Sequence, residues 1–179
     1  LVIFDAATGM EEYEIPSVPN GGYSIHAELA DVDGNGTDEV VIVNDDYPGS
    51  TLVRVIGWNG AAYDVLWQAE SSGSMVQYGQ FSPGGANDLV LWGSNGVQVL
   101  AGDTGASLYA STFDEAVEQV IVTNVDVDSS DEVIIQLYGA SPSIVILDSD
   151  RPADSVHRTF CETRLSLAQN SPNPFSGAT

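Results

Sequence analysis

An acidic motif that recurs at a nearly constant interval is the sequence feature that most restricts the fold of this chain. Three segments align without gaps: Ala30–Val41 (ADVDGNGTDEVV), Gly79–Val90 (GQFSPGGANDLV) and Thr123–Ile134 (TNVDVDSSDEVI). We number the motif from the second residue of each segment. Its ninth position is then acidic in all three segments, at Glu39, Asp88 and Glu132. These positions are 49 and 44 residues apart. A fixed period of about 20–50 residues is typical of solenoids, propellers and other repeat arrays.

Short apolar runs rich in β-branched and aromatic residues accompany the motif. Examples are VVIV at Val40–Val43 and LVLW at Leu89–Trp92, each bounded by Gly, Asn, Asp or Pro. Such runs, spaced about 8–12 residues apart, predict β-strands. No long amphipathic helical pattern competes with them, since Phe113–Gln119 would form one helical turn at most. The chain is therefore expected to be all-β.

The period has the length of one propeller blade, which holds four short strands. In each unit the first strand would end at the acidic motif, the second would be the apolar run, the third would end at a glycine turn, and a fourth would follow. The turn glycines are Gly9, Gly60 and Gly105. We therefore expect a partial β-propeller of four-stranded antiparallel sheets, with about three blades plus two strands. A β-sandwich with coincidental repeats is the alternative.

The charge of the chain excludes two classes of partner. Its 179 residues include 26 acidic residues, four Arg and no Lys, for a formal net charge of −22. Binding to nucleic acid or to an anionic membrane surface needs clusters of Lys and Arg, which are missing here. Because 43% of the residues are hydrophobic, the chain can still bury enough apolar surface to fold. No apolar run of membrane-spanning length occurs.

The first motif has the pattern of a calcium loop. Oxygen-bearing side chains fall at alternate positions, and a backbone carbonyl would complete the set; the predicted ligands are Asp31, Asp33, Asn35, Thr37 through its carbonyl, and Glu39. Calcium takes six to eight oxygen ligands, and a tight loop can direct alternate residues at one centre. The bidentate Glu of an EF-hand would fall at Ile42, so that motif is excluded. An acidic, solvated hairpin loop is the alternative.

The other two motifs keep this pattern to different degrees. The third predicts a second calcium loop with the ligands Asn124, Asp126, Asp128, Ser130 and Glu132. Its sixth position is Ser129, where the first motif has Gly36, and this exchange removes backbone freedom. The second motif, Gln80–Asp88, has a single carboxylate at the ligand positions and is expected to be free of metal.

The pattern D-x-D-x-N-G-x-x-E followed by VVIV resembles the FG-GAP or VCBS repeats of integrin-type β-propellers. The resemblance covers residues 1–150 and is closest in the first unit, good in the third and degenerate in the second. It implies a propeller with Ca²⁺ bound between the first two strands of a blade. In that family the metal usually has a structural role.

The C-terminal segment differs in composition from the rest. Residues 151–164 are expected to form a linker, or a last edge strand followed by a linker. Leu165–Thr179 resembles the opening of the sorting domain of type IX secretion, through the QNSPNPF run at Gln169–Phe175. That resemblance implies contact with the outer-membrane secretion machinery and a secreted or outer-membrane cell-surface location. The alternative is a Pro/Asn turn cluster that ends a domain.

Signals for catalysis are weak. The only histidines are His26 and His157, and no nucleophile elbow, P-loop or zinc-protease motif occurs. The tryptophans are expected to pack in the core; they are Trp58, Trp67 and Trp92. The sequence thus predicts a non-catalytic, calcium-binding propeller module of a secreted or cell-surface bacterial protein, for adhesion or for binding an unknown protein or glycan. The alternatives are the propeller part of a secreted polysaccharide-degrading enzyme and a structural spacer.

Overall fold

The computed structural model describes residues 2–14, 24–46, 50–81, 85–125, 130–140, 142–150 and 159–166. All regular structure in these residues is β-strand, which confirms the predicted all-β class. Among the described elements there is no helix long and apolar enough to cross a membrane.

The strands form four antiparallel sheets, which we name by their order along the chain. The hairpin sheet contains β1 (Val2–Phe4) and β2 (Glu11–Glu14). The first sheet contains β3 (Ser24–Ala30), β4 (Glu39–Asp46), β5 (Ser50–Trp58) and β6 (Tyr63–Ser71). The second contains β7 (Met75–Gly79), β8 (Asp88–Trp92), β9 (Gly96–Leu100) and β10 (Ser107–Thr112). The third contains β11 (Ala116–Thr123), β12 (Glu132–Tyr138), β13 (Ser143–Asp150) and β14 (Thr159–Ser166).

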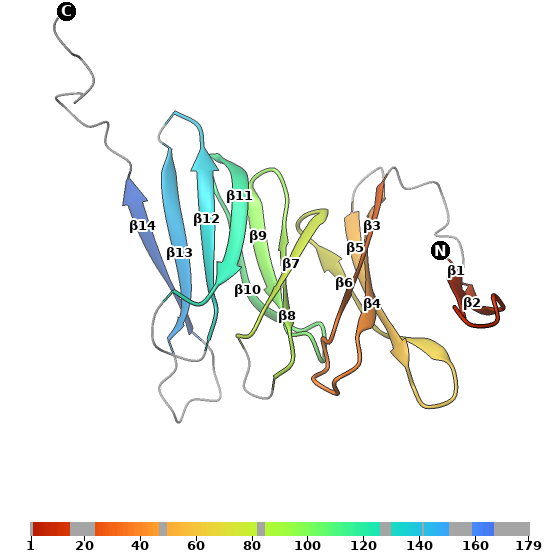
Figure 1. Ribbon diagram of the computed structural model, residues 1–179. Coiled ribbons are helices and arrows are strands. Elements are labelled where there is room, and N and C mark those ends of the chain that lie inside the picture. Colours follow the sequence, from red (N-terminus) through yellow and green to blue (C-terminus); the bar gives the residue numbers. More distant parts are fainter. Residues whose placement is uncertain are drawn as a thin grey trace, which may run out of the picture.

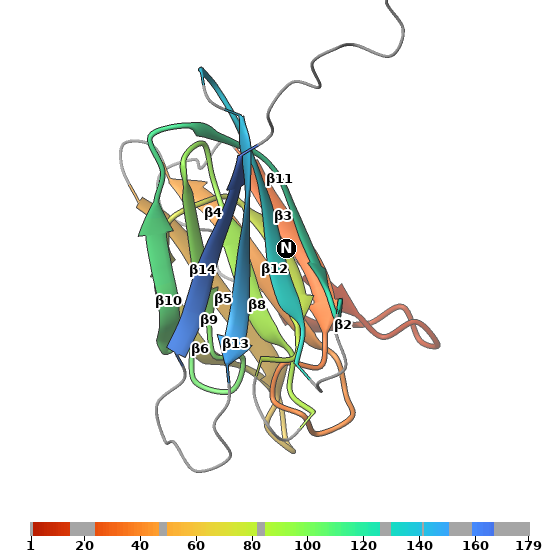
Figure 2. The ribbon, with the colours of Figure 1, turned by 90° about the vertical axis from the view of Figure 1, so that its left-hand side faces the viewer.

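Each sheet is a meander in which strands that follow one another in sequence are hydrogen-bonded neighbours. The sheets stand face to face in chain order, from the hairpin sheet at one end to the third sheet at the other (Figure 1). Seen along the stack, β3 and β11 lie on one side and β10 on the opposite side (Figure 2). Over the residues that the structure describes, the stack is open and does not close into a ring.

The core consists of apolar layers between successive sheets. The layer between the first and second sheets includes Val41, Val43, Val53, Val55, Leu89, Leu91 and Leu100. The layer between the second and third includes Val90, Val97, Val99, Val133, Ile135, Leu137, Val145 and Leu147. Each such side chain, when fully buried, stabilises the fold by about 1.5–3 kcal/mol relative to its exposed state. In β8 the consecutive residues 89–91 are all buried, because both faces of this sheet are covered.

The hairpin sheet covers the remaining face of the first sheet. A small cluster there contains Ile42 and Ile56, with Tyr13 of β2 packed against it. Trp58 lies near this cluster, but it is 52% exposed and touches the Tyr63 ring edge-on, with ring centroids 5.3 Å apart. The expectation of core packing is therefore wrong for Trp58, which follows the last buried position of β5. Trp67 and Trp92 are partly buried against the core layers.

Gly102 lies at a close approach between the first and second sheets. Its carbonyl accepts a hydrogen bond from Trp67 Nε1 (2.7 Å), and its N–H donates to the Asp88 carboxylate (3.1 Å). A Cβ at this position would lie 2.0 Å from the carbonyl oxygen of Asn87 and 2.4 Å from that of Val32. Backbone of Asn87 and of Val32 therefore fills the space that any side chain at residue 102 would need.

The third sheet includes residues that were mainly expected to form a linker. Its last strand, β14, pairs with β13 from Thr159 to Ser166. This strand lies over residues that were expected to form either a linker or a last edge strand. It also includes the first two residues of the segment that resembles a sorting domain, whose residues from 167 onward lie outside the described part of the chain.

Replacing Gly102 by Ala should destabilise the protein by about 1–3 kcal/mol or more, because the new methyl group meets rigid backbone. Gly96→Ala is the matched control, since a Cβ there meets its nearest atoms at ordinary contact distances of 3.5 Å and longer. That variant should change stability by less than about 1 kcal/mol. Urea denaturation of both variants measures the difference, and equal stabilities would contradict the close approach at Gly102.

Candidate metal centre

Three carboxylates meet in the loop between β3 and β4. The loop is closed by the backbone pairing of Ala30 with Glu39. One oxygen each from Asp31, Asp33 and Glu39 lies within 4.8 Å of the other two. The loop lies at the same end of the stack as the loop between β7 and β8, at the bottom of the view in Figure 1.

Asp31 organises the turn of this loop. Its Oδ1 accepts a hydrogen bond from the N–H of Gly34 (2.8 Å), and its Oδ2 accepts one from the N–H of Gly36 (2.9 Å). Both glycines have positive φ angles, 76° and 86°, which side chains with a Cβ rarely adopt. The two glycines thus turn the loop around the Asp31 carboxylate.

The exposed half of the loop is held by its own side chains. Asp33 accepts hydrogen bonds from Asn35, at Oδ1 from the backbone N–H (3.0 Å) and at Oδ2 from the side-chain amide (2.8 Å). Asn35 Oδ1 in turn accepts the N–H of Thr37 (2.7 Å). Four of the five predicted ligands, Thr37 included, therefore lie in one hydrogen-bonded loop, and Glu39 closes it.

Glu39 is the buried member of the group, with 2% of its surface exposed. Its Oε2 accepts a hydrogen bond from the N–H of Val32 (3.0 Å). Burial raises the pKa of the Glu39 carboxyl above its ordinary value. The hydrogen bond from Val32 opposes this rise in pKa, whereas the negative charges of Asp33 and Asp31 add to it.

The donor set fits a hard divalent cation. Carboxylate and amide oxygens are the ligands that Ca²⁺ prefers, and a carboxylate oxygen that accepts one N–H can still bind a second partner. Burial and the charges of Asp33 and Asp31 raise the pKa of Glu39, and a cation between the three carboxylates would offset the repulsion between their charges. The residues that would hold it are these three, with Asn35 and Thr37 beside them.

The third loop is described in part. Its ninth residue, Glu132, is buried and accepts the N–H of Val125 at Oε2 (2.6 Å), as Glu39 accepts that of Val32. Asn124 donates its side-chain amide to the Ser130 carbonyl (2.8 Å). The predicted ligands Asp126 and Asp128 lie outside the described residues, so the structure does not place them relative to the others.

The second loop has a single carboxylate, that of Asp88. Asp88 is buried at the same motif position, and its Oδ1 accepts the N–H of Gly102, in the turn between β9 and β10. This hydrogen bond connects the second loop to a neighbouring turn of its own sheet.

A contact between successive loops escaped the sequence analysis. The N–H of Asn87 donates to the carbonyl of Asp31 (3.1 Å), and the N–H of Asp131 donates to that of Gln80 (3.1 Å). Asn87 and Asp131 occupy the same, eighth position of the motif. Their side chains add a second bond each, from Asn87 Nδ2 to the Asp31 carbonyl (2.9 Å) and from Gln80 N–H to Asp131 Oδ2 (2.8 Å). The recurrence of Asp or Asn at the eighth position is the sequence signal that could have indicated these bonds between loops.

Comparison with known proteins gives no relative for this chain. No protein-family model matches it, and searches of curated proteins and of solved structures found no significant match.

The raised pKa of Glu39 makes a prediction for calcium-free protein. A carboxyl group with a higher pKa in the folded state favours the folded state when protonated, so its contribution declines as pH rises above the unfolded value of about 4.3. Glu39→Gln keeps an acceptor for Val32 and removes the charge. Relative to the parent, this variant should therefore gain stability as pH rises from about 4 to 7.

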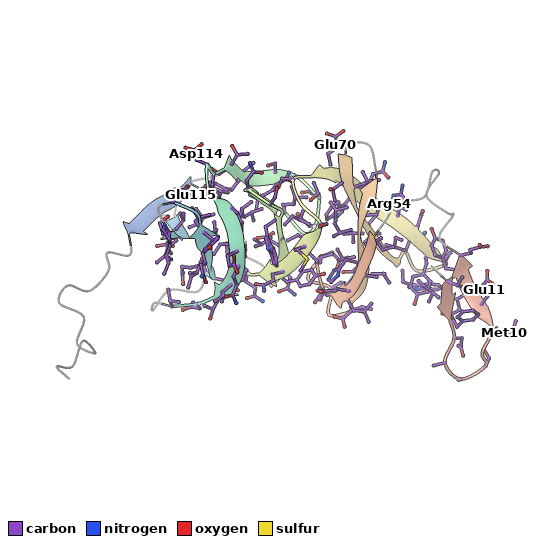
Figure 3. The ribbon with its side chains drawn as sticks, turned by 90° about the horizontal axis from the view of Figure 1, so that it is seen from above. Met10, Glu11, Arg54, Glu70, Asp114 and Glu115 are labelled. Carbon is purple, nitrogen blue, oxygen red and sulfur yellow. The ribbon has the colours of Figure 1, made fainter. Side chains whose placement is uncertain are left out.

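Urea denaturation at several pH values, after calcium has been removed with a chelating resin, measures this difference. Glu11→Gln, at an exposed position of β2 that Figure 3 labels, is the control and should show no such trend. A pH-independent difference between Glu39→Gln and the parent would refute the raised pKa of the Glu39 carboxyl.

Proposed function

We propose that this chain is a non-catalytic, calcium-binding β-propeller module of a secreted or cell-surface bacterial protein, which serves in adhesion or ligand binding. The observation that carries the proposal is the grouping of Asp31, Asp33 and Glu39 in a loop with the spacing of a calcium motif. The remaining support comes from the arrangement of the sheets and from the C-terminal sequence.

The sheet arrangement supports the propeller. Three successive four-stranded meanders share one strand order and stack face to face, with β3 and β11 on the same side (Figure 2). In each of the first two sheets the third strand is followed by a glycine turn, at Gly60 and Gly105, and the hairpin sheet repeats this turn at Gly9. The hairpin sheet would then be the last two strands of a further blade, as the sequence period predicts.

The hydrogen bonds of the loop support a structural role for the ion. Asp31, Asp33 and Glu39 each accept a backbone N–H from within the loop. An ion bound to the same carboxylates would join β3, the turn and β4 into one unit. Because the carbonyl of Asp31 also accepts a bond from Asn87, the ion would stabilise the contact with the second sheet as well.

The proposed location rests on the sequence alone. The QNSPNPF run at Gln169–Phe175 resembles the start of a type IX sorting domain, and a high acidic charge suits a soluble protein outside the cell. The proposed partners are therefore the outer-membrane secretion machinery and an extracellular ligand, and the proposed cofactor is Ca²⁺.

Calcium should raise the thermal unfolding temperature by several degrees, because a ligand that binds only the folded state stabilises it by RT ln(1 + [L]/Kd). The double variant Asp31→Ala, Asp33→Ala should lose most of this shift. Glu11→Gln, Asp114→Asn removes the same charge from exposed positions that lie apart at the periphery of the molecule (Figure 3) and should retain it.

Differential scanning calorimetry with added Ca²⁺ and with EDTA measures the shift. A parent protein whose unfolding temperature does not respond to calcium would rule out the metal centre. Loss of the shift in both double variants would show that calcium acts through the overall negative charge.

A further inference from the structure

An open groove of about 1020 Å³ lies away from the acidic loops, over the first strands of the three larger sheets. Its lining includes His26 and Glu28 from β3, Tyr78 from β7, Trp92 from β8, and Glu118 and Ile121 from β11. The groove therefore crosses three sheets on one side of the stack, the side of β3 and β11 in Figure 2.

Three of the strands that line the groove are edge strands of their sheets. Each of β3, β7 and β11 is the terminal strand of its sheet and pairs with one other described strand. The edge of β11 is bonded at two points, where Val117 N–H donates to the Ser94 carbonyl (2.9 Å) and Val122 N–H donates to Gln77 Oε1 (3.2 Å). Backbone donors and acceptors elsewhere along the three edges can pair with an extended peptide.

The charge of the groove is negative. Glu28 and Glu118 line it, and none of the described residues that line it is Lys or Arg. His26 Nε2 lies 2.5 Å from Glu28 Oε1, and the Glu28 side chain remains 37% exposed. A cleft lined by charges of one sign concentrates ligands of the opposite sign, so an anionic ligand is disfavoured here and a cationic one is favoured.

Aromatic and apolar side chains complete the lining. Trp92 is partly buried, whereas Met75 and Ile121 are 46% and 42% exposed. Burial raises the pKa of Tyr78, and the Glu28 carboxylate raises it further, so Tyr78 stays a neutral phenol at physiological pH. Faces of Trp and Tyr rings attract Lys and Arg side chains through cation–π contacts.

We infer that this groove binds an extended peptide segment that carries Lys or Arg side chains. One of the strand edges pairs with the backbone of the peptide. Glu28 and Glu118 face its cationic groups, and Trp92 and Tyr78 contact its side chains. The inference rests on the proposed ligand-binding function and names the ligand class, but it requires no calcium. A neutral glycan would use the same aromatic rings without needing the carboxylate charges.

Isothermal titration calorimetry with two blocked peptides tests this inference. One alternates valine and arginine; the other has citrulline, a neutral isostere, in place of arginine. We expect the arginine peptide to bind and the citrulline peptide to bind at least about tenfold more weakly, because it lacks the charge that the carboxylates recognise. Equal binding of the two peptides, or none, would overturn the inference.

The double variant Glu28→Gln, Glu118→Gln locates the binding. It should weaken binding of the arginine peptide about tenfold or more. Glu11→Gln, Glu70→Gln is the matched control, because it removes the same charge at two exposed positions on β2 and β6 (Figure 3). An equal loss in both double variants would show attraction to the whole acidic surface and contradict a site in the groove. Circular dichroism checks that both variants are folded.

The same titrations in calcium and in EDTA separate this inference from the metal centre. Peptide binding without a calcium-dependent unfolding temperature would support the groove and refute the calcium loop. A calcium-dependent unfolding temperature without peptide binding would refute the groove and leave the calcium loop intact. Binding of a neutral oligosaccharide that the Glu28→Gln, Glu118→Gln variant retains would overturn the peptide as ligand.

Discussion

Burial of sheet faces against neighbouring sheets is the constraint on which the rest of this structure depends. A four-stranded meander with valine and leucine on both faces cannot be stable alone in water, so each sheet requires its neighbour. The second residue of the loop motif shows this dependence. Val32 and Phe81 are fully buried between successive sheets, whereas the equivalent Val125, in a sheet with no described neighbour beyond it, is 56% exposed. The stacking of sheets therefore decides which apolar residues are covered.

Stacking also places the candidate metal centre and the groove at different parts of the sheets. The loops between the first two strands of neighbouring sheets come together at one end, where the backbone of Asn87 reaches that of Asp31. The first strands themselves gather along one side, where they line the groove as edge strands of their sheets. The candidate metal centre needs only a turn within a single sheet, whereas the groove forms only when three sheets stack side by side. Mutations that disturb the packing between sheets will therefore affect the groove before they affect the loop.

The sequence predicted the features that depend on local chemistry. Apolar runs bounded by turn residues indicated the strands, and the alternation of carboxylates indicated that Asp31, Asp33 and Glu39 would meet. Features that depend on neighbouring sheets could not be predicted in this way. The sequence does not indicate whether the Asp131 carboxylate faces solvent or accepts the N–H of Gln80. The stacking of the second and third sheets determines that it accepts this hydrogen bond. Trp58 was misplaced for a related reason, because its strand continues beyond the edge of the apolar layer.

Asp31 belongs to two structures at once, since its carboxylate holds the loop of the first sheet and its carbonyl is bound by the second. A chain built in this way behaves as a one-dimensional array, in which opening one sheet removes contacts from the next. The second sheet, which has a four-stranded sheet packed on each face, is then the last to open. Backbone amides in β8 and β9 should accordingly exchange with solvent near the rate of global unfolding, while those of the hairpin sheet exchange through local fraying.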